Sequence, residues 1–500
     1  MAEYLLGLDN GSTVIKAAIF DTKGREIAVS GEKIEMHMPE SGWYERSLDE
    51  IWEANAKAIK SVLRESGLHG RDITAVAATG HGNGLHLVDR NGEAVWNAIE
   101  GFDTRACKYV EKWQADGTLD KVFPLITQNL FASQWPPLLA WFRDNKSEVL
   151  EKAESVFCVK DYVRFKLTGV RNIEMTDLSG CGIMNVPEGR YDDRILDAFG
   201  LSSYRRLLPE IVKSDEICGY VTPEAAALTG LELGTPVAGG AFDIDAVGLA
   251  LGLNDESKLN LIAGTWGNNQ CLVRNPVIDK DLFMVSRYAI DGYYLILEGS
   301  PTGASNLEWF VTELMKKNGF KASPDQSVYA LCDIEVDKTS AEDADIICLP
   351  FLYGNNCGGN ARAAYIGMEG HHTRNDMLRA VFEGIVFSHR THIEKLMKHR
   401  EAPTEIRMGG GAGKSKVWTQ IFADILQIPI EIPEGTETGA LGAAICAGSA
   451  AGIFSSLEDG ISKMVSMGRR VKPDRQKAEI YNRKYDLYRK AVKVLKAYWE

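Results

Sequence analysis

The chain has 500 residues, of which 45% are hydrophobic and 25% are charged, an ordinary composition for a folded globular protein. At roughly 150 residues per domain it would form two to four domains, and a disordered chain, a collagen or a small disulfide-stapled scaffold is excluded. Its 69 acidic and 56 basic residues give a formal charge of −13, which argues against a surface built to bind nucleic acid.

Nine cysteines are scattered along the sequence without a CxxC pair or the spacing of a zinc site, and a reducing compartment is the simplest interpretation. The first four residues lead straight into a strand-like run, without the features of a signal peptide. No uninterrupted apolar run approaches the ~18 residues of a membrane span. We therefore expect a cytoplasmic protein that has neither a membrane nor a nucleic-acid partner.

The first residues alternate between apolar runs and turn signals, which predicts an antiparallel meander of three strands over 4–8, 17–20 and 25–29. Ser47 and Glu50 then stand at capping-box spacing, ahead of an apolar stripe that predicts an amphipathic helix. A buried strand over 73–78 follows it and ends in a glycine-rich loop.

A similar strand-turn-strand pattern returns later in the chain, with strands predicted over 259–263 and 270–273. Two similar openings suggest a duplicated architecture with a boundary near residues 245–255, although hairpins are common enough to resemble each other by chance. The acidic segment 323–345 predicts a helix with surface loops. The last helix carries an apolar stripe, for which packing on the domain is a better account than a membrane surface; its members are Tyr481, Tyr485, Tyr488, Val492 and Leu495.

The hairpin Asp9-Asn10-Gly11-Ser12-Thr13 has backbone N–H groups and two hydroxyls that can cradle phosphate oxygens. Asp9 at the strand end can hold Mg²⁺, and Lys16 can neutralise phosphate charge. A plain polar hairpin is the alternative, because Asn-Gly is a favoured turn. Gly264-Thr265 has the same local character, so two such turns facing each other across a cleft would clamp a polyphosphate.

The stretch 409–415 ends in Gly-Lys-Ser like a P-loop, but Met408 occupies the position where that motif needs its first glycine. The glycine-rich stretch is therefore one residue shorter than the P-loop motif requires. A glycine-rich strand-to-helix junction of this kind can still let the sugar or base of a nucleotide approach the backbone closely.

Asp243 is predicted at a strand-to-helix junction, where it is either a catalytic carboxylate or a helix cap. Asp245 is the better N-cap candidate by position. In the loop Gly80-His81-Gly82-Asn83-Gly84 the amide of Asn83 suits a polyhydroxylated ligand, and His81 is better explained as a loop residue than as a metal ligand.

Several further motifs lie in the second half of the chain. They are Ala363-x-Tyr365-x-Gly367-Met368 followed after seven residues by 376–383, then 349–354, Trp418 with Gln420 and Asp424, and 437–444. Together with the motifs above they resemble the FGGY family of carbohydrate kinases over nearly the whole chain. Within that family the chain looks most like the L-xylulose kinases, through Gly264-Thr265-Trp266, Ser300-Pro301-Thr302, 306–310 and 387–392.

The resemblance implies an α/β fold of two actin-like (ribonuclease H-like) domains around a cleft, with a sugar-binding domain at 1–245 and an ATP-binding domain at 246–500. It implies that Asp243 is the general base and that Asp9 lies beside Mg²⁺. The residues that it assigns to the phosphates are Ser12, Thr13, Lys16, Gly264 and Thr265. Those that it assigns to the adenosine site are Ala304, Glu308, Gly410, Gly411 and Ser415. A homodimer is the expectation for the assembly.

One departure from the family concerns the substrate loop, which in D-xylulose kinases reads Gly-Gln-Met-His-Gly. Gly82 and Asn83 replace its methionine and histidine here, which we expect to open the pocket and leave room for a bulkier ligand such as a keto-sugar acid. Asp103 and Arg105 match the family's Trp-x-Asp-x-Arg neighbourhood, although Gly101 replaces the tryptophan.

The resulting hypothesis is transfer of the γ-phosphoryl group of MgATP to a terminal hydroxyl of a five-carbon ketose, with substrate contacts from Gly82, Asn83, Asp103 and Asp243. L-xylulose is the first substrate to consider, and 3-keto-L-gulonate, D-xylulose, ribulose and erythritol are the alternatives. A non-kinase actin-like ATPase and a P-loop NTPase are the rival functions.

Overall fold

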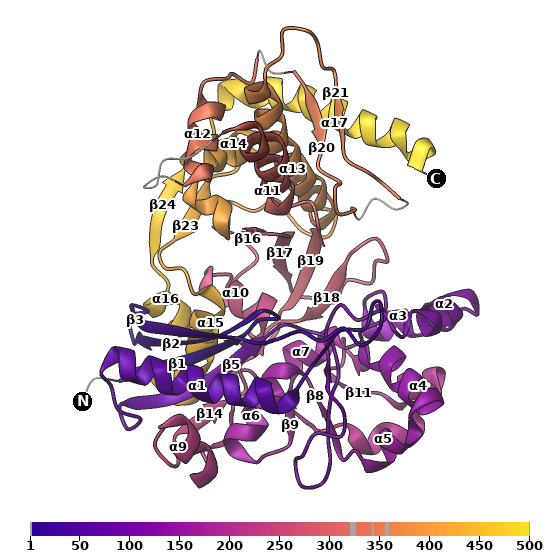
Figure 1. Ribbon diagram of the computed structural model, residues 1–500, viewed down its shortest axis with the longest axis vertical. Helices are drawn as coiled ribbons and strands as arrows, with labels where there is room; N and C mark the ends of the chain where they lie inside the picture. Colours follow the sequence, from indigo (N-terminus) through magenta and orange to yellow (C-terminus); the bar gives the residue numbers. More distant parts are fainter. Residues whose placement is uncertain (1–2, 321–326, 343–344, 356–359, 500) are drawn as a thin grey trace.

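Two mixed β-sheets, each flanked by helices, form the two halves of the computed structural model (Figure 1). The structure describes residues 3–320, 327–342, 345–355 and 360–499. The N-terminal half, in indigo and magenta, lies at one end of the long axis, and most of the C-terminal half lies at the other.

The first sheet has seven strands and contains the predicted meander. In spatial order they are β13 (Ile217–Tyr220), β14 (Pro236–Ala238), β5 (Ile73–Gly80), β1 (Tyr4–Asn10), β2 (Val14–Asp21) and β3 (Glu26–Lys33), with β15 (Ala241–Phe242) paired to β5. The central strand β1 runs antiparallel to β2 and parallel to β5. Its leucines are fully buried because both faces of the sheet are covered.

The second sheet also has seven strands. In spatial order they are β18 (Met284–Arg287), β19 (Tyr294–Ser300), β17 (Gly267–Val273), β16 (Lys258–Ala263), β22 (Glu405–Gly409), β23 (Ile430–Pro433) and β24 (Met467–Val471). Here β16 runs antiparallel to β17 and parallel to β22, as β1 does to β2 and β5. This correspondence supports a duplicated architecture.

Short two-stranded ladders and helices complete the fold. The ladders pair β4 (Glu45–Arg46) with β7 (Ala98–Ile99), β6 (His86–Val88) with β8 (Ser155–Phe157), β9 (Asn172–Glu174) with β12 (Glu210–Val212), β10 (Met184–Asn185) with β11 (Arg190–Tyr191) and β20 (Ile347–Leu349) with β21 (Ala364–Ile366). The helices up to residue 250 are α1 (Leu48–Ser66), α2 (Cys107–Ala115), α3 (Thr118–Ile126), α4 (Trp135–Asn145), α5 (Ser147–Lys152), α6 (Val159–Thr168), α7 (Met175–Gly180), α8 (Asp193–Phe199), α9 (Pro223–Thr229) and α10 (Asp243–Ala250). Those beyond it are α11 (Ala304–Phe310), α12 (Val328–Asp337), α13 (Arg374–Leu396), α14 (Lys416–Leu426), α15 (Thr438–Ala450), α16 (Leu457–Met464) and α17 (Ala478–Trp499).

Helix α1 begins where the sequence predicts, directly after Ser47. The Ser47 hydroxyl accepts a hydrogen bond from the Glu50 backbone N–H, and Gly67 closes the helix in the left-handed region at φ 70°. The predicted stripe is buried against the first sheet: its members Leu48 and Ile59 are at most 1% exposed, and Trp52, Ala56 and Leu63 at most 7%. The capping residues and the buried face thus both support the predicted helix.

Helix α15 belongs to the second half of the chain but packs against the first sheet (Figure 1). A Cβ on Gly7 of β1 would lie 1.9 Å from the Ala440 carbonyl oxygen, and one on Gly442 would lie 2.0 Å from that of Ala246. Glycine is required at both positions because the backbones touch. The run of small residues in 438–450 is therefore a contact surface between the halves.

Helix α10 reaches the second sheet in the same manner. The Gln270 side-chain amide donates to the Ile244 carbonyl oxygen at 3.2 Å, and that of Asn260 donates to the Gly248 carbonyl oxygen at 3.3 Å. The predicted boundary between residues 245 and 246 falls inside this helix and stays a prediction.

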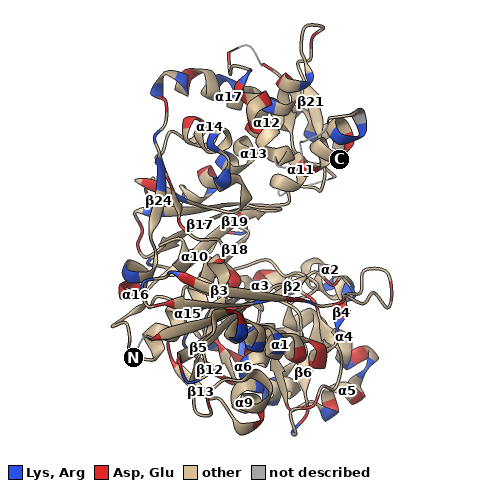
Figure 2. Cartoon of the chain, turned by 60° about the vertical axis from the view of Figure 1, so that its left-hand side comes forward, with Lys and Arg blue, Asp and Glu red and all other residues tan. Residues whose placement is uncertain are grey.

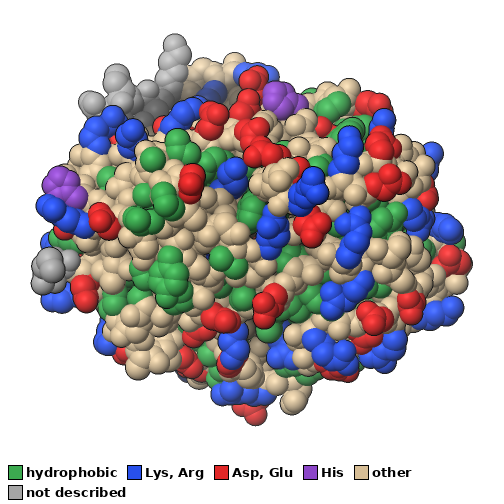
Figure 3. Space-filling view, turned by 90° about the horizontal axis from the view of Figure 1, so that it is seen from below, with side chains coloured by type: hydrophobic (Ala, Val, Ile, Leu, Met, Phe, Trp, Pro, Cys, Tyr) green, Lys and Arg blue, Asp and Glu red, His purple; other side chains and the backbone are tan. Residues whose placement is uncertain are grey.

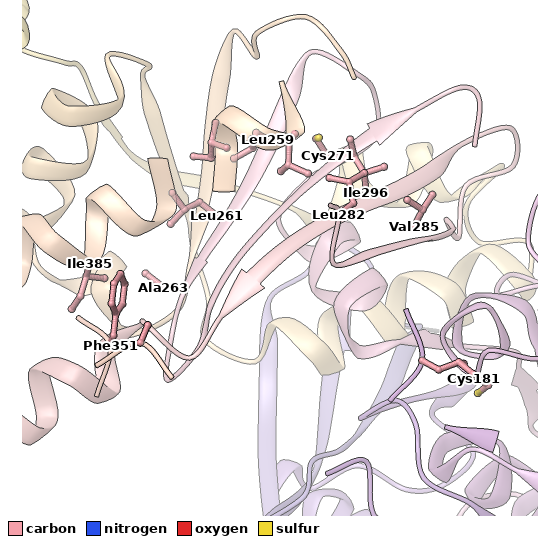
Figure 4. Packing of buried hydrophobic residues seen from close by; sticks show 14 of the residues in the cluster. Cys181, Leu259, Leu261, Ala263, Cys271, Leu282, Val285, Ile296, Phe351 and Ile385 are labelled. Atoms are coloured by element: carbon pink, nitrogen blue, oxygen red, sulfur yellow. The ribbon is translucent and has the colours of Figure 1, made fainter. Parts of the chain in front are cut away.

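The strand β18 also joins the halves. The Thr127 hydroxyl donates to the Val285 carbonyl oxygen at 2.8 Å, and Gln128 and Met284 form an isolated antiparallel bridge. One hydrophobic cluster accordingly runs from Cys181 in the first half to Leu261 and Ile385 in the second (Figure 4). Apolar side chains therefore connect the two halves beside the region where the predicted site residues gather.

The C-terminal helix α17 confirms the predicted packing. Tyr481, Tyr485 and Tyr488 are buried, and Val492 and Leu495 are half-buried. Of the acidic segment 323–345, the structure describes a helix, α12, and residues 323–326 and 343–344 lie outside the described residues. Among the described helices, none combines the length and the apolar character that crossing a membrane would need.

Acidic and basic residues are interspersed along the elements of both halves (Figure 2). On the face seen from below, small apolar areas are separated by charged side chains of both signs (Figure 3). The charge of −13 is thus spread over the surface rather than gathered in one field.

Candidate active site

Asp9 and Asp243 lie at one edge of the first sheet, where the parallel strands β1, β5 and β15 end. Asp9 is paired with Thr79 of β5, and Phe242 is paired with Gly80. The Thr79 hydroxyl also donates to the Ala241 carbonyl oxygen at 2.7 Å. Strand pairing therefore brings the two aspartates, 234 positions apart in the numbering, to neighbouring strand ends.

Both carboxyl groups have raised pKa values. Burial, and to a smaller extent the charge of Asp9, raise the pKa of Asp243 to about 7. A hydrogen bond from the Ile244 backbone N–H acts in the opposite direction and lowers this pKa. Burial raises the pKa of Asp9 to about 6, an effect that Lys16 opposes and Glu437 supports. Asp243 is thus a carboxyl group that gains and loses a proton near neutral pH, as a general base requires.

The prediction that Asp245 caps helix α10 is wrong. The helix begins at Asp243, and the Asp245 side chain lies within its first turn, fully buried. One of its carboxylate oxygens accepts a hydrogen bond from the Ala289 backbone N–H at 3.3 Å. Asp245 therefore faces the protein interior, which distinguishes it from Asp243.

The first hairpin confirms the predicted turn between β1 and β2, with Ser12 half-buried and Thr13 exposed. The ammonium of Lys16 lies 2.8 Å from a carboxylate oxygen of Glu437, which directly precedes α15. Lys16 thus has a carboxylate partner from the other half of the chain, and a phosphate group would have to compete with it.

The second hairpin, between β16 and β17, contains Gly264 and Thr265. The Ala304 backbone N–H donates to the Gly264 carbonyl oxygen at 2.7 Å, which attaches this hairpin to the start of α11. The exposed Thr265 is free of the sheet ladder. Gly264, a predicted phosphate residue, and Ala304, a predicted adenosine residue, are therefore neighbours at the start of α11.

A pocket of about 480 Å³ contains four of the five predicted adenosine residues in its lining, and Gly410 is not among them. Its lining includes Thr265, Ala304, Glu308, Gly411 and Ser415, and its size is that of an ordinary small-molecule site. Sequence reasoning did not assign the other lining residues to this site; among them are Tyr329, Ala330 and Asp333 of α12, Phe382 of α13, and Lys414.

The glycines beside this pocket have different roles. Gly410 has φ 88°, and a Cβ there would lie 2.6 Å from the Ala263 carbonyl oxygen. Gly411 has only open space where its Cβ would stand. The Ser415 hydroxyl donates to a carboxylate oxygen of Asp333 at 2.7 Å and accepts from the Trp418 backbone N–H, so it also caps α14.

The substrate loop differs from the expectation that Gly82 opens the pocket. A Cβ on Gly82 would lie 2.4 Å from two ring carbons of Phe242, so this aromatic ring fills the space that the missing side chain leaves. Asn83 takes the left-handed conformation at φ 63°, which asparagine tolerates better than most residues. The loop therefore presents an amide beside an apolar wall.

A buried charge network lies behind this loop, and it contains Asp103. The Asp103 carboxylate accepts two hydrogen bonds from the Arg105 guanidinium at 2.9 Å and one from the Tyr44 backbone N–H at 2.8 Å. The side chain is not exposed, so its predicted contact with substrate stays a prediction. Sequence reasoning missed the neighbouring pair of Arg46 and Glu100, which no local pattern marks.

Residues 4–250 match the N-terminal domain of the FGGY family of carbohydrate kinases, and residues 259–451 match its C-terminal domain. The chain belongs to the FGGY family of carbohydrate kinases. It is 34% identical to the L-xylulose/3-keto-L-gulonate kinase of Escherichia coli (strain K12) over 100% of this chain and 98% of that protein. It is 33% identical to a probable L-xylulose kinase of Pasteurella multocida (strain Pm70) over 99% of each.

Among solved structures, the xylulose kinase from Rhodospirillum rubrum matches with a TM-score of 0.89 and 24% identity over 99% of each chain. The fold is therefore the actin-like α/β fold of FGGY kinases, and the protein is a carbohydrate kinase. Members of this family use ATP as the phosphoryl donor. This membership decides against a P-loop NTPase and a non-kinase ATPase.

Proposed function

We propose that this FGGY kinase transfers the γ-phosphoryl group of ATP to a terminal hydroxyl of a small ketose, with L-xylulose as the first substrate to test. The observation that carries the proposal is the position of Asp243, a buried carboxyl with a pKa of about 7 at the strand end beside the substrate loop. The names of the two relatives support L-xylulose, and the name of the first supports 3-keto-L-gulonate as well. 3-Keto-L-gulonate, D-xylulose, ribulose and erythritol are the alternatives.

Asp243 is the base in this proposal. The acceptor oxygen forms a bond to the γ-phosphorus while the bond between that phosphorus and the bridging oxygen of ADP breaks. The hydroxyl proton passes to the Asp243 carboxylate as the new bond forms, and ADP leaves with the bridging oxygen. The protein thus supplies position and charge, and no covalent intermediate is needed.

The two hairpins would hold the polyphosphate between the halves. Ser12, Thr13 and Lys16 would contact it from the first half, and Gly264 and Thr265 from the second. Ala304, Glu308, Gly410, Gly411 and Ser415 would line the adenosine site, which the shared pocket of about 480 Å³ supports for four of them. Binding of the sugar to one half and of ATP to the other would favour closure of the two halves, which would exclude water from the reacting groups.

Asp9 fits a role as a Mg²⁺ ligand. Its carboxylate is a hard oxygen donor with a pKa raised by burial, and a cation beside it would relieve that cost. When bound, Mg²⁺ would neutralise charge on the phosphate oxygens. Assembly into a homodimer and a location in the cytoplasm both stay predictions.

A panel of ketoses, polyols and sugar acids, assayed by coupled ADP release, tests the acceptor. We expect L-xylulose to give the highest kcat/KM. ADP release that does not depend on any sugar of the panel would contradict the proposed function, whereas a different best sugar would revise the substrate alone.

A further inference from the structure

Two motifs in the second half of the chain have no part in the proposed function. One is Ser300-Pro301-Thr302, at the end of β19, and the other is 387–392, within α13. Four of their polar side chains are at most 4% exposed: Ser300, Thr302, Ser388 and His392. Hydrogen bonds join these four groups, so the two motifs meet in one buried network.

The network begins at Glu298, which is also buried. One of its carboxylate oxygens lies 2.8 Å from Nδ1 of His392 and 3.2 Å from the ammonium of Lys395. Its other oxygen accepts from the Phe283 backbone N–H at 2.8 Å. Since a carboxylate accepts, Nδ1 carries a hydrogen and donates it. Lys395 supplies the positive charge that Glu298 needs, so we assign the neutral imidazole, whose Nε2 is then an acceptor.

The network continues from His392 through three hydroxyl groups. Nε2 of His392 lies 2.8 Å from Oγ of Ser300, and that oxygen lies 2.6 Å from Oγ1 of Thr302. Oγ1 of Thr302 in turn lies 2.7 Å from Oγ of Ser388. Because Nε2 accepts from Ser300, each hydroxyl donates toward the imidazole and accepts from the next hydroxyl. The bond between His392 and Glu298 therefore sets the direction of the whole network.

The far side of this network supports the second hairpin, between β16 and β17. Ser300 is paired with Gly267, the first residue of β17. A Cβ on Gly303 would lie 2.4 Å from the Gly264 carbonyl oxygen and 2.7 Å from that of Thr265. The segment between β19 and α11 therefore packs backbone to backbone against the hairpin to which we assign the phosphates.

We propose that His392 is a positioning residue for phosphoryl transfer, which holds Ser300 and with it the segment that supports the second hairpin. Being buried, His392 acts through these neighbours and does not touch ATP. Phosphoryl transfer depends on positioning, and a displacement of about 1 Å can lower a rate by about 10²-fold. This inference rests on the proposed function, because it assigns the phosphates to that hairpin.

A purely structural role is the alternative. A buried polar network also stabilises the fold, and the loss of one member leaves its partners without hydrogen bonds. A lower Tm alone would therefore not support the inference. The test needs variants that differ in which nitrogen of the imidazole they replace.

His392→Gln and His392→Asn separate the two nitrogens. The glutamine amide reaches about as far as Nε2 and can keep the bond to Ser300, whereas the asparagine amide reaches about as far as Nδ1 and can keep the bond to Glu298. Each variant retains one bond, so we expect similar Tm values in calorimetry.

The rates of the two variants are compared with MgATP varied, at a saturating concentration of the best sugar of the panel. We expect kcat/KM for ATP to be about ten-fold lower in His392→Asn than in His392→Gln, mainly through kcat, because the hairpin would act on the phosphates in the transition state. Equal values in the two variants would overturn the inference.

Ser300→Ala tests the next member of the network, with Ser286→Ala as its matched control. Ser286 is a fully buried serine of β18 whose hydroxyl has no hydrogen-bond partner among the described residues. We expect Ser300→Ala to lower kcat/KM for ATP about three-fold or more and Ser286→Ala to leave it nearly unchanged. In the Ser300→Ala background the advantage of His392→Gln over His392→Asn should disappear, and its persistence would contradict the inference.

These outcomes separate the inference from the proposed function. If no sugar of the panel stimulates ADP release by the wild type, the proposed function fails and the inference fails with it. If a sugar does and the two His392 variants are equal, the inference alone is wrong. If either His392 variant does not fold, the comparison of Ser300→Ala with Ser286→Ala decides, and equal rates there would overturn the inference.

Discussion

Asp243 owes its chemistry to its surroundings rather than to its residue type. An exposed aspartate is ionised at neutral pH and is a weak base, whereas burial and the charge of Asp9 raise the pKa of Asp243 to about 7. Asp245, two positions later, is fully buried whereas Asp243 is half-buried, and Asp245 accepts a hydrogen bond from the Ala289 backbone N–H in the interior. The burial of Asp245 in the interior therefore distinguishes it from Asp243, the proposed base.

The raised pKa predicts the pH dependence of the reaction. Because the carboxylate form accepts the proton, the active fraction rises as the pH rises through about 7 and falls about ten-fold per pH unit below it. Measuring kcat/KM for the sugar between pH 5.5 and 8.5 at saturating MgATP checks this. A profile that stays flat down to pH 5.5 would show that the reaction does not use a base with this pKa.

Sequence reasoning reached the aspartates because both stand at strand ends, which local patterns mark. It could not find that Phe242 fills the space beside Gly82, since this contact joins residues 160 positions apart in the numbering. It also missed the pair of Arg46 and Glu100, which are 54 positions apart. Contacts of this kind depend on how strands are paired, and one sequence does not contain that pairing.

At the scale of elements, the hairpins β1–β2 and β16–β17 are the parts that the sequence predicts best, because apolar runs and turn residues alternate within a few positions. The packing of α15 on the first sheet was not predicted. The reason for its small residues is the close contact between the backbones of Gly7 in β1 and Ala440 in α15, which the sequence does not reveal. A stripe of small residues looks like a plain helix until its partner is known.

Gly442→Ala tests this crossing of the halves. Alanine normally favours a helix over glycine by about 0.5–1 kcal/mol, but here the new Cβ would lie 2.0 Å from the Ala246 carbonyl oxygen. We expect a loss of about 1–3 kcal/mol in stability, visible as a lower Tm in scanning calorimetry. Gly370→Ala, where a Cβ meets nothing within 4 Å, is the matched control and should leave Tm nearly unchanged. A Gly442→Ala protein as stable as the wild type would show that the helices are not in this contact.

Gly411→Leu tests the adenosine pocket. A Cβ at Gly411 meets no protein atom within 4 Å, and Gly411 lines the pocket where we place the nucleotide. We therefore expect the variant to fold and its leucine side chain to occupy part of that pocket. We expect KM for ATP to rise about ten-fold or more, with little change in KM for the sugar. Gly370→Leu controls for the loss of a glycine. An unchanged KM for ATP would place the adenosine elsewhere.

At the scale of the whole molecule, the proposed site takes residues from two halves. Helices α10 and α15 each contact the sheet of the other half, and an ion pair also joins the halves. Lys16 and Glu437 come from opposite ends of the chain and lie 2.8 Å apart. Since the pair is partly exposed, it is worth at most about 1 kcal/mol. A triphosphate that takes Lys16 from Glu437 would therefore release the pair at a small cost.

Glu437→Gln should for this reason improve nucleotide binding. Without the competing carboxylate, Lys16 is free for phosphate, and we expect KM for ATP to fall by about two- to five-fold, as a pair of up to about 1 kcal/mol allows. Lys16→Met should raise KM for ATP, and in the Lys16→Met background the effect of Glu437→Gln should disappear. If Glu437→Gln instead raised KM for ATP, Glu437 would be a positioning residue for Lys16 and not its competitor.

The central claim is that Asp243 is the base of a sugar kinase, and sugar-dependent ADP release by Asp243→Asn and Asp245→Asn tests it most directly. We predict that Asp243→Asn loses about 10²–10⁴-fold in kcat while its affinity for ATP, measured by calorimetry, stays close to that of the wild type. Asp245→Asn should retain most of its turnover, provided that its Tm shows a folded protein. Near-normal turnover by Asp243→Asn, or loss of turnover by Asp245→Asn alone, would contradict the account.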